Sequence, residues 1–391
     1  MPFSEAVAIN PKRQLPRERQ VPFLDMASLP LNGADVSVLT TREMSSGGSR
    51  FQSGDTLFAR ITPSAENGKL GFVQSINGGQ VAQGSTEFIV MAGRDGLTLS
   101  EYVRYLAGWS EVRDQAIGLM EGTSGRQRVP QSAFDEIEVP IPPLEEQRRI
   151  AEVLRSVDEA IERAHLATAG AKAARLALLA DLFHRADWEP ERALPTGWQT
   201  PLLDQVAKRG SGHTPNKQFP TYWDGEVKWI SLQDTKRLDR VYIADTTATI
   251  TPDGLANSSA VLHPASTVVV SRDATVGKSA IMMSDMAVSQ HFISYTCGPE
   301  LSPLYLYYWL QRMKPVFERI GAGSTIKTIG LPFFKTLKIA MPGRAEQDQT
   351  AELLWQADRQ VFEAEEAVVK LRSVKAVVSS DLLSGRVRVP A

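Results

Sequence analysis

The sequence predicts an α+β protein in which two mixed α/β globular parts are separated by two long helices that pair as an antiparallel coiled coil. Three observations lead to this fold class. An uninterrupted helical pattern covers 144–183, a second copy of it follows 200 residues later, and strand-like runs divided by glycine turns precede each copy. Self-similarity at a fixed period marks an architecture of repeated units. We therefore expect an internal two-fold repeat.

The first long helix is predicted over 144–183, because no proline interrupts this stretch and Pro142 and Pro143 precede it. Proline is tolerated at a helix start, and Glu145 and Glu146 place negative charge at the positive end of the helix dipole. Apolar residues recur at alternating steps of three and four, which is a heptad seam that needs a partner helix. The predicted seam contains Leu154, Val157, Ile161, Ala164, Thr168, Ala171, Arg175, Leu178 and Leu182.

The partner helix is predicted over 344–385 of the same chain. Glu346-Gln347 repeats Glu146-Gln147, and the similarity continues without a gap to Asp381-Leu382, which repeats Asp181-Leu182. Even the polar position of the seam keeps its charge, because Lys375 repeats Arg175. The second seam contains Leu354, Ala357, Val361, Ala364, Val368, Leu371, Lys375, Val378 and Leu382.

The composition is that of a globular soluble protein, with 42% hydrophobic and 23% charged residues over 391 positions. This length suggests two or three domains, and the repeat selects two. We expect no membrane span, because no long apolar run occurs. The single cysteine, Cys297, excludes an internal disulfide and fits a reducing cytoplasm. A net charge of −2 argues against unspecific coating of nucleic acid but leaves local basic patches open.

The first globular part is predicted over 1–143. Its first twenty residues form a polar arm, which is either a solvated tail or a basic arm that touches phosphate. The arm carries Lys12, Arg13, Arg17 and Arg19. Strand-like runs occur at 36–39, 56–61, 71–73 and 88–91, followed by a helical run over 100–118 and a loop over 122–128. Asn-Gly turns between the runs suggest hairpins.

A linker is predicted over 184–197, and the second globular part over 198–343. Its signals recur in the same order: 265–272 repeats 54–60, Gly277-Lys278 repeats Gly68-Lys69, and Ser289-Gln-His-Phe-Ile293 repeats Ser85-Thr-Glu-Phe-Ile89. The loops differ in length while the scaffold repeats. Variable loops on a repeated scaffold are where recognition usually lies.

The parts of an enzyme are missing from the sequence. Gly277-Lys278-Ser279 resembles the end of a phosphate-binding loop, but the leading glycine of that motif would fall on Arg272. No glycine fingerprint links a strand to a helix, and Cys297 has no CxxC partner. The five histidines show no paired metal spacing. Carboxylate pairs lie at helix starts, where the helix dipole explains them.

Basic and amide side chains gather instead on loops of both halves. Arginine and lysine read guanine edges, asparagine and glutamine read adenine, and phosphates take the rest. Any one of them alone is better explained as a solvated surface charge, but the same types recur at matching points of both halves, which makes the collective signal stronger. The candidates for DNA binding are Arg60, Lys69, Ser124, Arg126, Gln127 and Arg128 in the first half, and His213, Thr214, Lys217, Gln233, Lys236, Arg237, Arg272, Lys278 and Lys327 in the second. We expect Tyr222, Trp223 and Trp229 to pack within the fold rather than stack on bases.

Several segments resemble the specificity subunit of type I restriction-modification systems. They are Val139-Pro-Ile-Pro-Pro-Leu-Glu-Glu-Gln147, Asp181-Leu-Phe183, Gly197-Trp198, Ser211-Gly-His-Thr-Pro215, Tyr222-Trp-Asp-Gly-Glu-Val-Lys-Trp-Ile230, Glu346-Gln347 and Leu382-Leu-Ser-Gly385. The resemblance covers nearly the whole chain. In one departure, the second copy reads Met341-Pro-Gly-Arg-Ala-Glu-Gln347, so the apolar residue before the helix is lost. This leaves open how tightly the second helix start packs.

The resemblance implies two target-recognition domains, each reading one half of a split site in double-stranded DNA. The long helices would act as a spacer and offer outer faces to two methyltransferase subunits, with restriction and translocase subunits in the full complex. The chain would not be a catalyst, and S-adenosylmethionine would belong to the methyltransferase partner. We expect a cytoplasmic protein and half-site centres about one helical turn (~34 Å) apart.

Other interpretations remain open at the level of sequence. The same module could serve a restriction system in which methylase and nuclease are fused in one partner chain. From another class, a coiled-coil adaptor would bind protein through its globular parts and show no sequence-dependent DNA binding. A nuclease or methyltransferase in its own right is disfavoured by the missing motifs.

Overall fold

The structure is a computed structural model that describes residues 1–14, 20–36, 39–45, 47–76, 80–123, 125–183, 194–321 and 328–389. Among the predicted features, Ser124, Lys327, Arg17, Arg19 and 184–193 of the linker lie outside the described residues. The chain divides into two compact units. Unit 1 is Met1–His165 with Glu366–Ala391, and unit 2 is Leu166–Glu365. Both boundaries fall inside a long helix, at positions that differ by the 200-residue period of the repeat.

Unit 1 contains two small mixed sheets. In spatial order, the first sheet has β1 (Ala8–Ile9), β9 (Phe88–Ala92), β6 (Thr56–Ala59), β7 (Leu70–Phe72) and β3 (Ala34–Asp35). The second sheet has β4 (Thr40–Glu43), β2 (Gln20–Leu24), β8 (Ala82–Gly84) and β5 (Ser49–Phe51). The short helices are α1 (Phe3–Ala6), α2 (Ser100–Gly108), α3 (Ser110–Gly118) and α4 (Ala133–Glu136).

Unit 2 repeats both sheets. In spatial order, its first sheet has β10 (Ala207–Ser211), β18 (Phe292–Cys297), β15 (Val268–Ser271), β16 (Ser279–Met282) and β12 (Tyr242–Ile243). Its second sheet has β13 (Ala248–Ile250), β11 (Trp223–Ile230), β17 (Met286–Val288) and β14 (Leu262–His263). The remaining short elements are α6 (Leu203–Val206), η2 (Pro220–Tyr222), η3 (Leu232–Lys236), α7 (Pro252–Ala256), α8 (Pro303–Gly321) and α9 (Leu331–Thr336).

The two units share strand order and strand direction throughout. The outer pair of the first sheet, β3 with β7 and β12 with β16, is parallel in both units, whereas its other pairs are antiparallel. The central pair of the second sheet, β2 with β8 and β11 with β17, is also parallel in both. The predicted fold class and its internal repeat are therefore confirmed.

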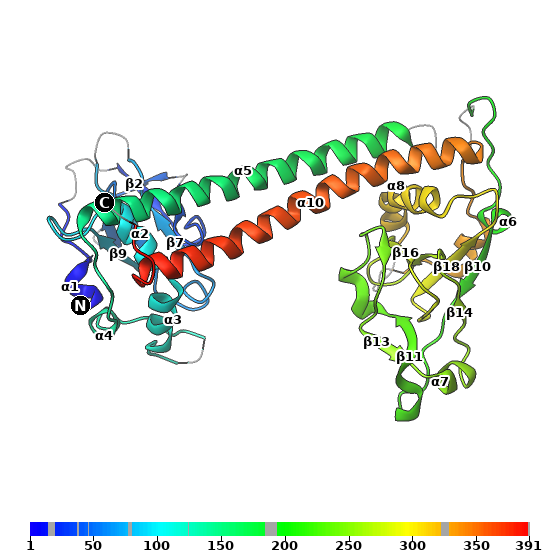
Figure 1. Cartoon of the computed structure of the whole chain (residues 1–391), viewed down its shortest axis with the longest axis horizontal. Helices are drawn as coiled ribbons and strands as arrows, with labels where there is room; N and C mark the ends of the chain where they lie inside the picture. The colour runs from blue at the N-terminus through cyan, green and yellow to red at the C-terminus, as the bar shows by residue number, and fades with distance from the viewer. Residues whose placement is uncertain are drawn as a thin grey trace. The chain divides into compact units, whose positions relative to one another are not determined.

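The long helices are α5 (Leu144–Leu182) and α10 (Arg344–Leu383). Within each unit a segment of α5 lies antiparallel to a segment of α10 (Figure 1). In unit 1, Asp158 faces Lys375 and His165 faces Arg372. In unit 2, Lys172 of α5 faces Glu365 of α10. Every predicted seam position on both helices is buried or half-buried, and none is exposed.

A glutamine fastens the start of each long helix to its unit. Gln147 donates to the carbonyl oxygens of Leu97 and Pro142, both over 2.8 Å, and accepts from the Leu99 amide over 2.9 Å. Gln347 makes the matching three hydrogen bonds in unit 2, all of 2.9 Å. Both side chains are fully buried. The second helix start is thus held as firmly as the first, although it lacks the apolar residue of the first copy.

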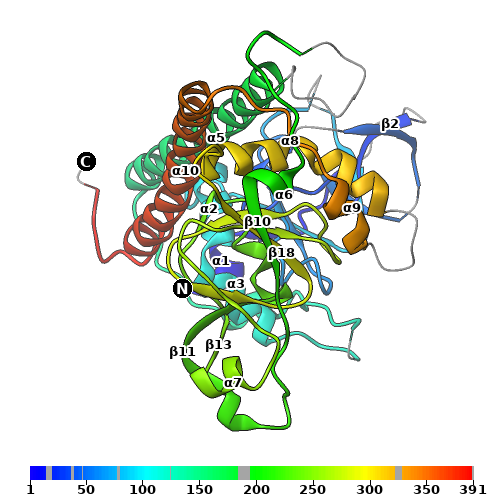
Figure 2. The same ribbon diagram turned by 90° about the vertical axis from the view of Figure 1, so that its right-hand side faces the viewer.

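In unit 2, α8 lies between α10 and the sheet that contains β10 and β18 (Figures 1 and 2). Aromatic residues of α8, among them Tyr305, Tyr308 and Trp309, are almost completely buried in the main core of this unit. In unit 1, α2 occupies the corresponding place, with Tyr102 and Tyr105 in the core. The helices fix the sheets to the long helices, and the loops at the sheet edges remain accessible.

Two local predictions were wrong. The run at 36–39 was expected to be a strand, but its described residues Val36 and Leu39 lie between β3 and β4 and pack as loop residues against a core cluster. The helical run 100–118 is broken at Trp109, whose backbone is extended (φ −65°, ψ 131°). Trp109 is 6% exposed, so burial of the indole favours this kink over a continuous helix.

Candidate nucleic-acid interface

The first loop cluster follows strand β6 of unit 1 and contains Arg60, Glu87, Arg126, Gln127 and Arg128. The Arg60 amide donates to the Glu87 carbonyl over 2.9 Å, while the Gln127 amide donates to the Thr62 hydroxyl over 3.2 Å. Arg128 forms a forked pair with the Glu87 carboxylate at 2.8–3.0 Å. The structure therefore brings together four of the predicted DNA-binding residues of this half.

The arginines of this cluster differ in availability. The hydrogen bonds that Arg128 donates to the Glu87 carboxylate raise the pKa of Arg128 and occupy much of its guanidinium. Arg60 is half-buried, and its Nε is buried without a hydrogen-bond partner. Arg126 is exposed, and its guanidinium has no protein partner among the described residues. Arg126 is thus the side chain of this cluster most available to a phosphate or a base.

The second loop cluster follows strand β15 of unit 2 and contains Thr214, Arg272, Asp273, Gln290 and His291. Its backbone frame matches the first, because the Arg272 amide donates to the His291 carbonyl over 2.9 Å, as Arg60 does to Glu87. Its side chains differ: Asp273 pairs with His291 over 2.9 Å, and Arg272 Nε donates to the Ile329 carbonyl over 3.0 Å. The same frame thus carries different chemistry in the two units.

The loop that carries His213 and Thr214 crosses the end of strand β17 at close range. A Cβ on Gly212 would lie 1.6 Å from the Val288 carbonyl oxygen, so only glycine fits there. The next amide, that of His213, donates to the same carbonyl over 3.1 Å, and the His213 carbonyl accepts from Trp229 Nε1 over 3.1 Å. These contacts hold Thr214 within hydrogen-bond distance of Gln290.

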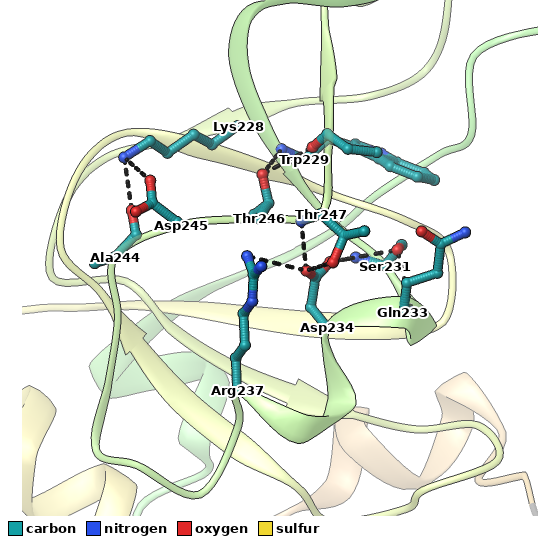
Figure 3. Close-up of polar contacts among 11 residues, drawn as sticks. Lys228, Trp229, Ser231, Gln233, Asp234, Arg237, Ala244, Asp245, Thr246 and Thr247 are labelled. Atoms are coloured by element: carbon teal, nitrogen blue, oxygen red, sulfur yellow. Dashed lines mark hydrogen bonds and ion pairs between the residues drawn. The ribbon is translucent and has the colours of Figure 1, made fainter. Parts of the chain in front are cut away.

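Asp234 organises a third loop, shown in Figure 3. Its fully buried carboxylate accepts from the Ser231 amide over 2.9 Å and from the Thr247 amide and hydroxyl over 2.7 and 2.8 Å, with Arg237 3.7 Å away. The Gln233 side chain points away from this carboxylate (Figure 3). Gln233 and Lys236 are both exposed, so the buried acid holds η3 in place and leaves these two predicted residues accessible.

A neighbouring ion pair holds the segment around Ala244 and Asp245 against strand β11. Lys228 Nζ donates to the Ala244 carbonyl over 2.6 Å and pairs with Asp245 over 2.9 Å, and this hydrogen bond lowers the pKa of Asp245 (Figure 3). A shallow hollow opens beside it. The hollow is lined by Lys236, Arg237, Arg240, Tyr242, Ile243, Ala244 and Asp245. Of the three cations here, Arg237 pairs with Asp234 and Arg240 with Glu365.

Lys69 and Lys278, which were predicted to bind DNA, instead bind backbone carbonyl oxygens of their own unit. Lys69 Nζ donates to the carbonyl oxygens of Met26 and Ala27 over 2.6 and 2.9 Å, and Lys278 Nζ donates to that of Thr235 over 2.9 Å. Both ammonium groups therefore hold a loop of their own unit. Lys217, which was also predicted to bind DNA, is exposed and lies on the loop before η2.

The aromatic residues near these loops divide into packed and exposed ones. Trp229 is 6% exposed and meets Trp223 edge-on with ring centroids 5.2 Å apart. Both rings pack within the fold, as predicted from the sequence. Tyr222 contacts Phe219, which is 49% exposed. Phe219 is thus the aromatic ring of this region that a partner can reach.

The described residues contain no cluster of three or more histidine, cysteine or acidic side chains that could hold a metal ion. Burial raises the pKa of the Cys297 thiol to about 12, so this sulfur is a poor nucleophile at neutral pH. No described helix is both long and apolar enough to cross a bilayer.

Sequence reasoning missed the acids that hold the loops. Glu87, Asp234 and Asp273 were not singled out, because an acidic residue on a surface loop carries no signal of burial. Gln290 and His291 were noted only as a repeat of Thr86 and Glu87. The change from Thr86-Glu87 to Gln290-His291, within a segment that otherwise repeats, was the signal that could have identified them.

The sequence of this chain is similar to one family of known proteins. The profile of the type I restriction modification DNA specificity domain matches residues 83–169 and 195–370. The specificity subunit of type I restriction enzyme MjaIX from Methanocaldococcus jannaschii is 24% identical over 163 residues, which are 41% of this chain and 38% of that protein. The match thus spans well under half of that relative. The specificity subunit proposed for enzyme MjaX of the same organism is 21% identical over 355 residues, 86% of this chain and 79% of that one.

The fold has a counterpart among solved structures. A chain from work on complex assembly and conformational transition of the type I R-M system has a TM-score of 0.66 with this structure at 19% identity. The superposition covers 99% of this chain and 97% of that chain. The likeness in fold therefore extends over both units.

Proposed function

Because this chain belongs to the family of type I restriction modification DNA specificity domains, we propose that it is the sequence-specific DNA-binding subunit of a type I restriction-modification complex. It reads a bipartite target in double-stranded DNA and positions partner subunits, and it has no catalytic role of its own. In this proposal it acts in the cytoplasm, where the target DNA is found.

The observation that carries the proposal is the pairing of one scaffold with two different sets of loops. The loop clusters occupy the same place after β6 and β15 and share a backbone frame, yet one presents Glu87 with Arg128 and the other His291 with Asp273. A pair of readers for two different half-sites needs this combination. A shared frame gives equal placement, and different side chains give different base preferences.

We assign the target-recognition domains to 1–143 and 198–343, with 184–197 as linker. The helices over 144–183 and 344–385 form the spacer between them, and its length sets the gap in the target. Half-site centres about one helical turn (~34 Å) apart follow from this assignment, because both readers then approach one face of the duplex.

The DNA contacts divide by availability. Exposed side chains, namely Arg126, His213, Lys217, Gln233 and Lys236, are assigned to phosphates and base edges. Arg60, Gln127, Arg128, Thr214 and Arg272 line the same loops with part of their surface covered. Lys69 and Lys278 act through the loops that they hold. In the arm, Lys12 is exposed, whereas Arg13 forms an ion pair with the buried Asp55 and therefore holds the arm to the fold.

The proposal requires partner subunits that carry out the methylation and cleavage of DNA. Two methyltransferase subunits, which bring S-adenosylmethionine, would bind the outer faces of the long helices, and restriction and translocase subunits would complete the assembly. Exposed apolar residues on these helices, such as Leu353 at 50% and Val377 at 61% exposure, support a protein partner there.

A domain exchange tests the proposal. Residues 21–143 are replaced by the corresponding part of another specificity subunit, and adenine methylation is mapped in cells that also contain the cognate methyltransferase. We expect one half-site to change while the other half-site and the gap persist. Replacing 198–343 should change the opposite half-site. If both exchanges altered the same half-site, or neither altered any, the assignment of two independent readers would be wrong.

A further inference from the structure

Gln290 is an exposed amide between β17 and β18, and both of its polar atoms are held by neighbouring side chains. The Thr214 hydroxyl lies 2.6 Å from Gln290 Oε1, and His291 Nε2 lies 3.4 Å from Gln290 Nε2. His291 Nδ1 in turn lies 2.9 Å from Asp273 Oδ2. Four side chains therefore form one chain of hydrogen bonds from Asp273 to Thr214, and the accessible amide of Gln290 lies within it.

The direction of this chain follows from the acid at its buried end. The Asp273 carboxylate is 16% exposed and can only accept, so Nδ1 of His291 carries the proton. In the neutral imidazole, Nε2 is then an acceptor, and Gln290 Nε2 donates to it. At the other end, Gln290 Oε1 accepts from the Thr214 hydroxyl. The amide orientation of Gln290 is thus set from both sides before any ligand binds.

The groups that remain free on Gln290 select a base. A carboxamide has two N–H donors and an oxygen with two lone pairs, and the protein uses one of each. One donor and one acceptor therefore remain on the same exposed amide. In the major groove adenine presents the N7 acceptor and the N6 donor, which an amide meets with two hydrogen bonds. Guanine presents two acceptors there, which leave the free amide oxygen opposite a like group.

We infer that Gln290 reads an adenine in the half-site recognised by unit 2, with Thr214, His291 and Asp273 as positioning residues. The inference rests on the proposed function and adds a residue and a base to it. Preorganised polar groups lose less freedom on binding, so the held amide discriminates better than a mobile one would.

Unit 1 provides an internal contrast. The corresponding segment reads Ser85-Thr-Glu-Phe-Ile89, so Thr86 takes the place of Gln290 and Glu87 that of His291. Glu87 is committed to Arg128, and no amide is held at this point. The Gln290 arrangement therefore has no counterpart at the matching position of unit 1.

The test maps adenine methylation in cells that contain the cognate methyltransferase and either the wild-type chain or Gln290→Ala. We expect the variant to keep the first half-site and the gap, and to relax one A·T position of the second half-site. Preference at that position should fall by between about 5-fold and 150-fold. Gln115→Ala, an exposed glutamine of unit 1, is the control and should leave the motif unchanged.

The positioning residues are tested by a matched pair at Thr214. Thr214→Val removes the hydroxyl at nearly constant shape and should weaken the same A·T position, whereas Thr214→Ser keeps the hydroxyl and should retain the preference. A wild-type motif that persists in full at the second half-site of Gln290→Ala overturns this inference and leaves the proposed function intact. A wild-type chain that directs no split motif at all overturns both.

Discussion

Asp158 and Asp358 make the same contact in the two units, although they lie on different long helices. Asp158 Oδ2 accepts from the Tyr105 hydroxyl over 3.0 Å, and Asp358 Oδ2 accepts from the Tyr308 hydroxyl over 2.8 Å. Each tyrosine belongs to the helix that covers the main sheet of its unit. The two hydrogen bonds therefore fasten each globular part to a long helix by the same device.

A cation from the opposite long helix completes each contact. Lys375 Nζ lies 2.5 Å from Asp158 Oδ1, and Arg175 Nε lies 3.0 Å from Asp358 Oδ1. These cations occupy the polar position of the two predicted seams. The conserved charge within the repeat is thus explained by an acid on the partner helix.

Asp358→Ala should destabilise unit 2 strongly. Asp358 is 6% exposed, and its loss leaves Arg175 and Tyr308 without their partner in a buried place. Breaking a buried pair from one side costs about 3–5 kcal/mol. Hydrogen exchange followed by mass spectrometry should show faster exchange in α8. Asp348→Ala, which removes an exposed pair on the same helix, is the control and should leave α8 unchanged.

Gln347→Ala should loosen the start of α10. The buried amide satisfies the Ser302 amide and two carbonyl oxygens, and an unsatisfied buried group costs about 1–3 kcal/mol. Gln347→Glu should be at least as harmful, because a carboxylate faces two carbonyl oxygens that need donors. Thermal unfolding compares both with the exposed control Gln356→Ala. A Glu variant as stable as the wild type would show that these two donated hydrogen bonds contribute nothing.

The tail after α10 should detach in acid. Arg388 forms two hydrogen bonds with the Glu146 carboxylate and lowers the pKa of Glu146 from its ordinary 4.5. A lowered folded-state pKa stabilises the bound tail fully above that ordinary value, and the contribution is lost as the pH falls through the lowered one. Trimming of the tail by an acid-tolerant carboxypeptidase should therefore accelerate below pH 4.5. Glu146→Gln should be trimmed quickly at pH 7, and slow trimming of this variant would contradict the ion-pair account.

Arg126→Ala and Lys69→Met should affect DNA binding in different ways. A phosphate contact by Arg126 predicts weaker binding to all sequences and a salt dependence that is smaller by about one in the logarithmic slope. Lys69 holds the carbonyl oxygens of Met26 and Ala27, so its loss should perturb that loop and leave the salt slope unchanged. Titration of DNA at several salt concentrations separates the two. An unchanged slope for Arg126→Ala would remove Arg126 from the phosphate contacts.

Repetition and helix-start signals allowed the fold class to be predicted from sequence. The start of α5 at Leu144 and both seams follow from periodicity and local chemistry, which act over a few residues. The break at Trp109 did not follow, because it depends on the core that receives the indole. The strand predicted over 36–39 was wrong for a similar reason. Val36 and Leu39 are apolar because they cover a core cluster from a loop, and in sequence such residues resemble a short strand.

The candidate site was predictable in its chemistry but not in its detail. Arg126 and Gln233 were identified by residue type and are exposed. Lys69 and Lys278 were identified in the same way, but their ammonium groups donate to backbone carbonyl oxygens of their own unit. Which of two lysines meets a carbonyl oxygen depends on tertiary geometry that residue types do not encode. The role proposed for Gln290 depends on Thr214, 76 residues away, and only the fold brings the two side chains together.

The most direct test of the central claim is a genome-wide map of adenine methylation in a host that carries the neighbouring methyltransferase, with and without this chain. The account predicts a split motif with a fixed gap that is present with the chain and disappears when only this chain is deleted. An unchanged methylation pattern without the chain would contradict the claim that it reads DNA, and binding of protein by its globular parts would then be the better account.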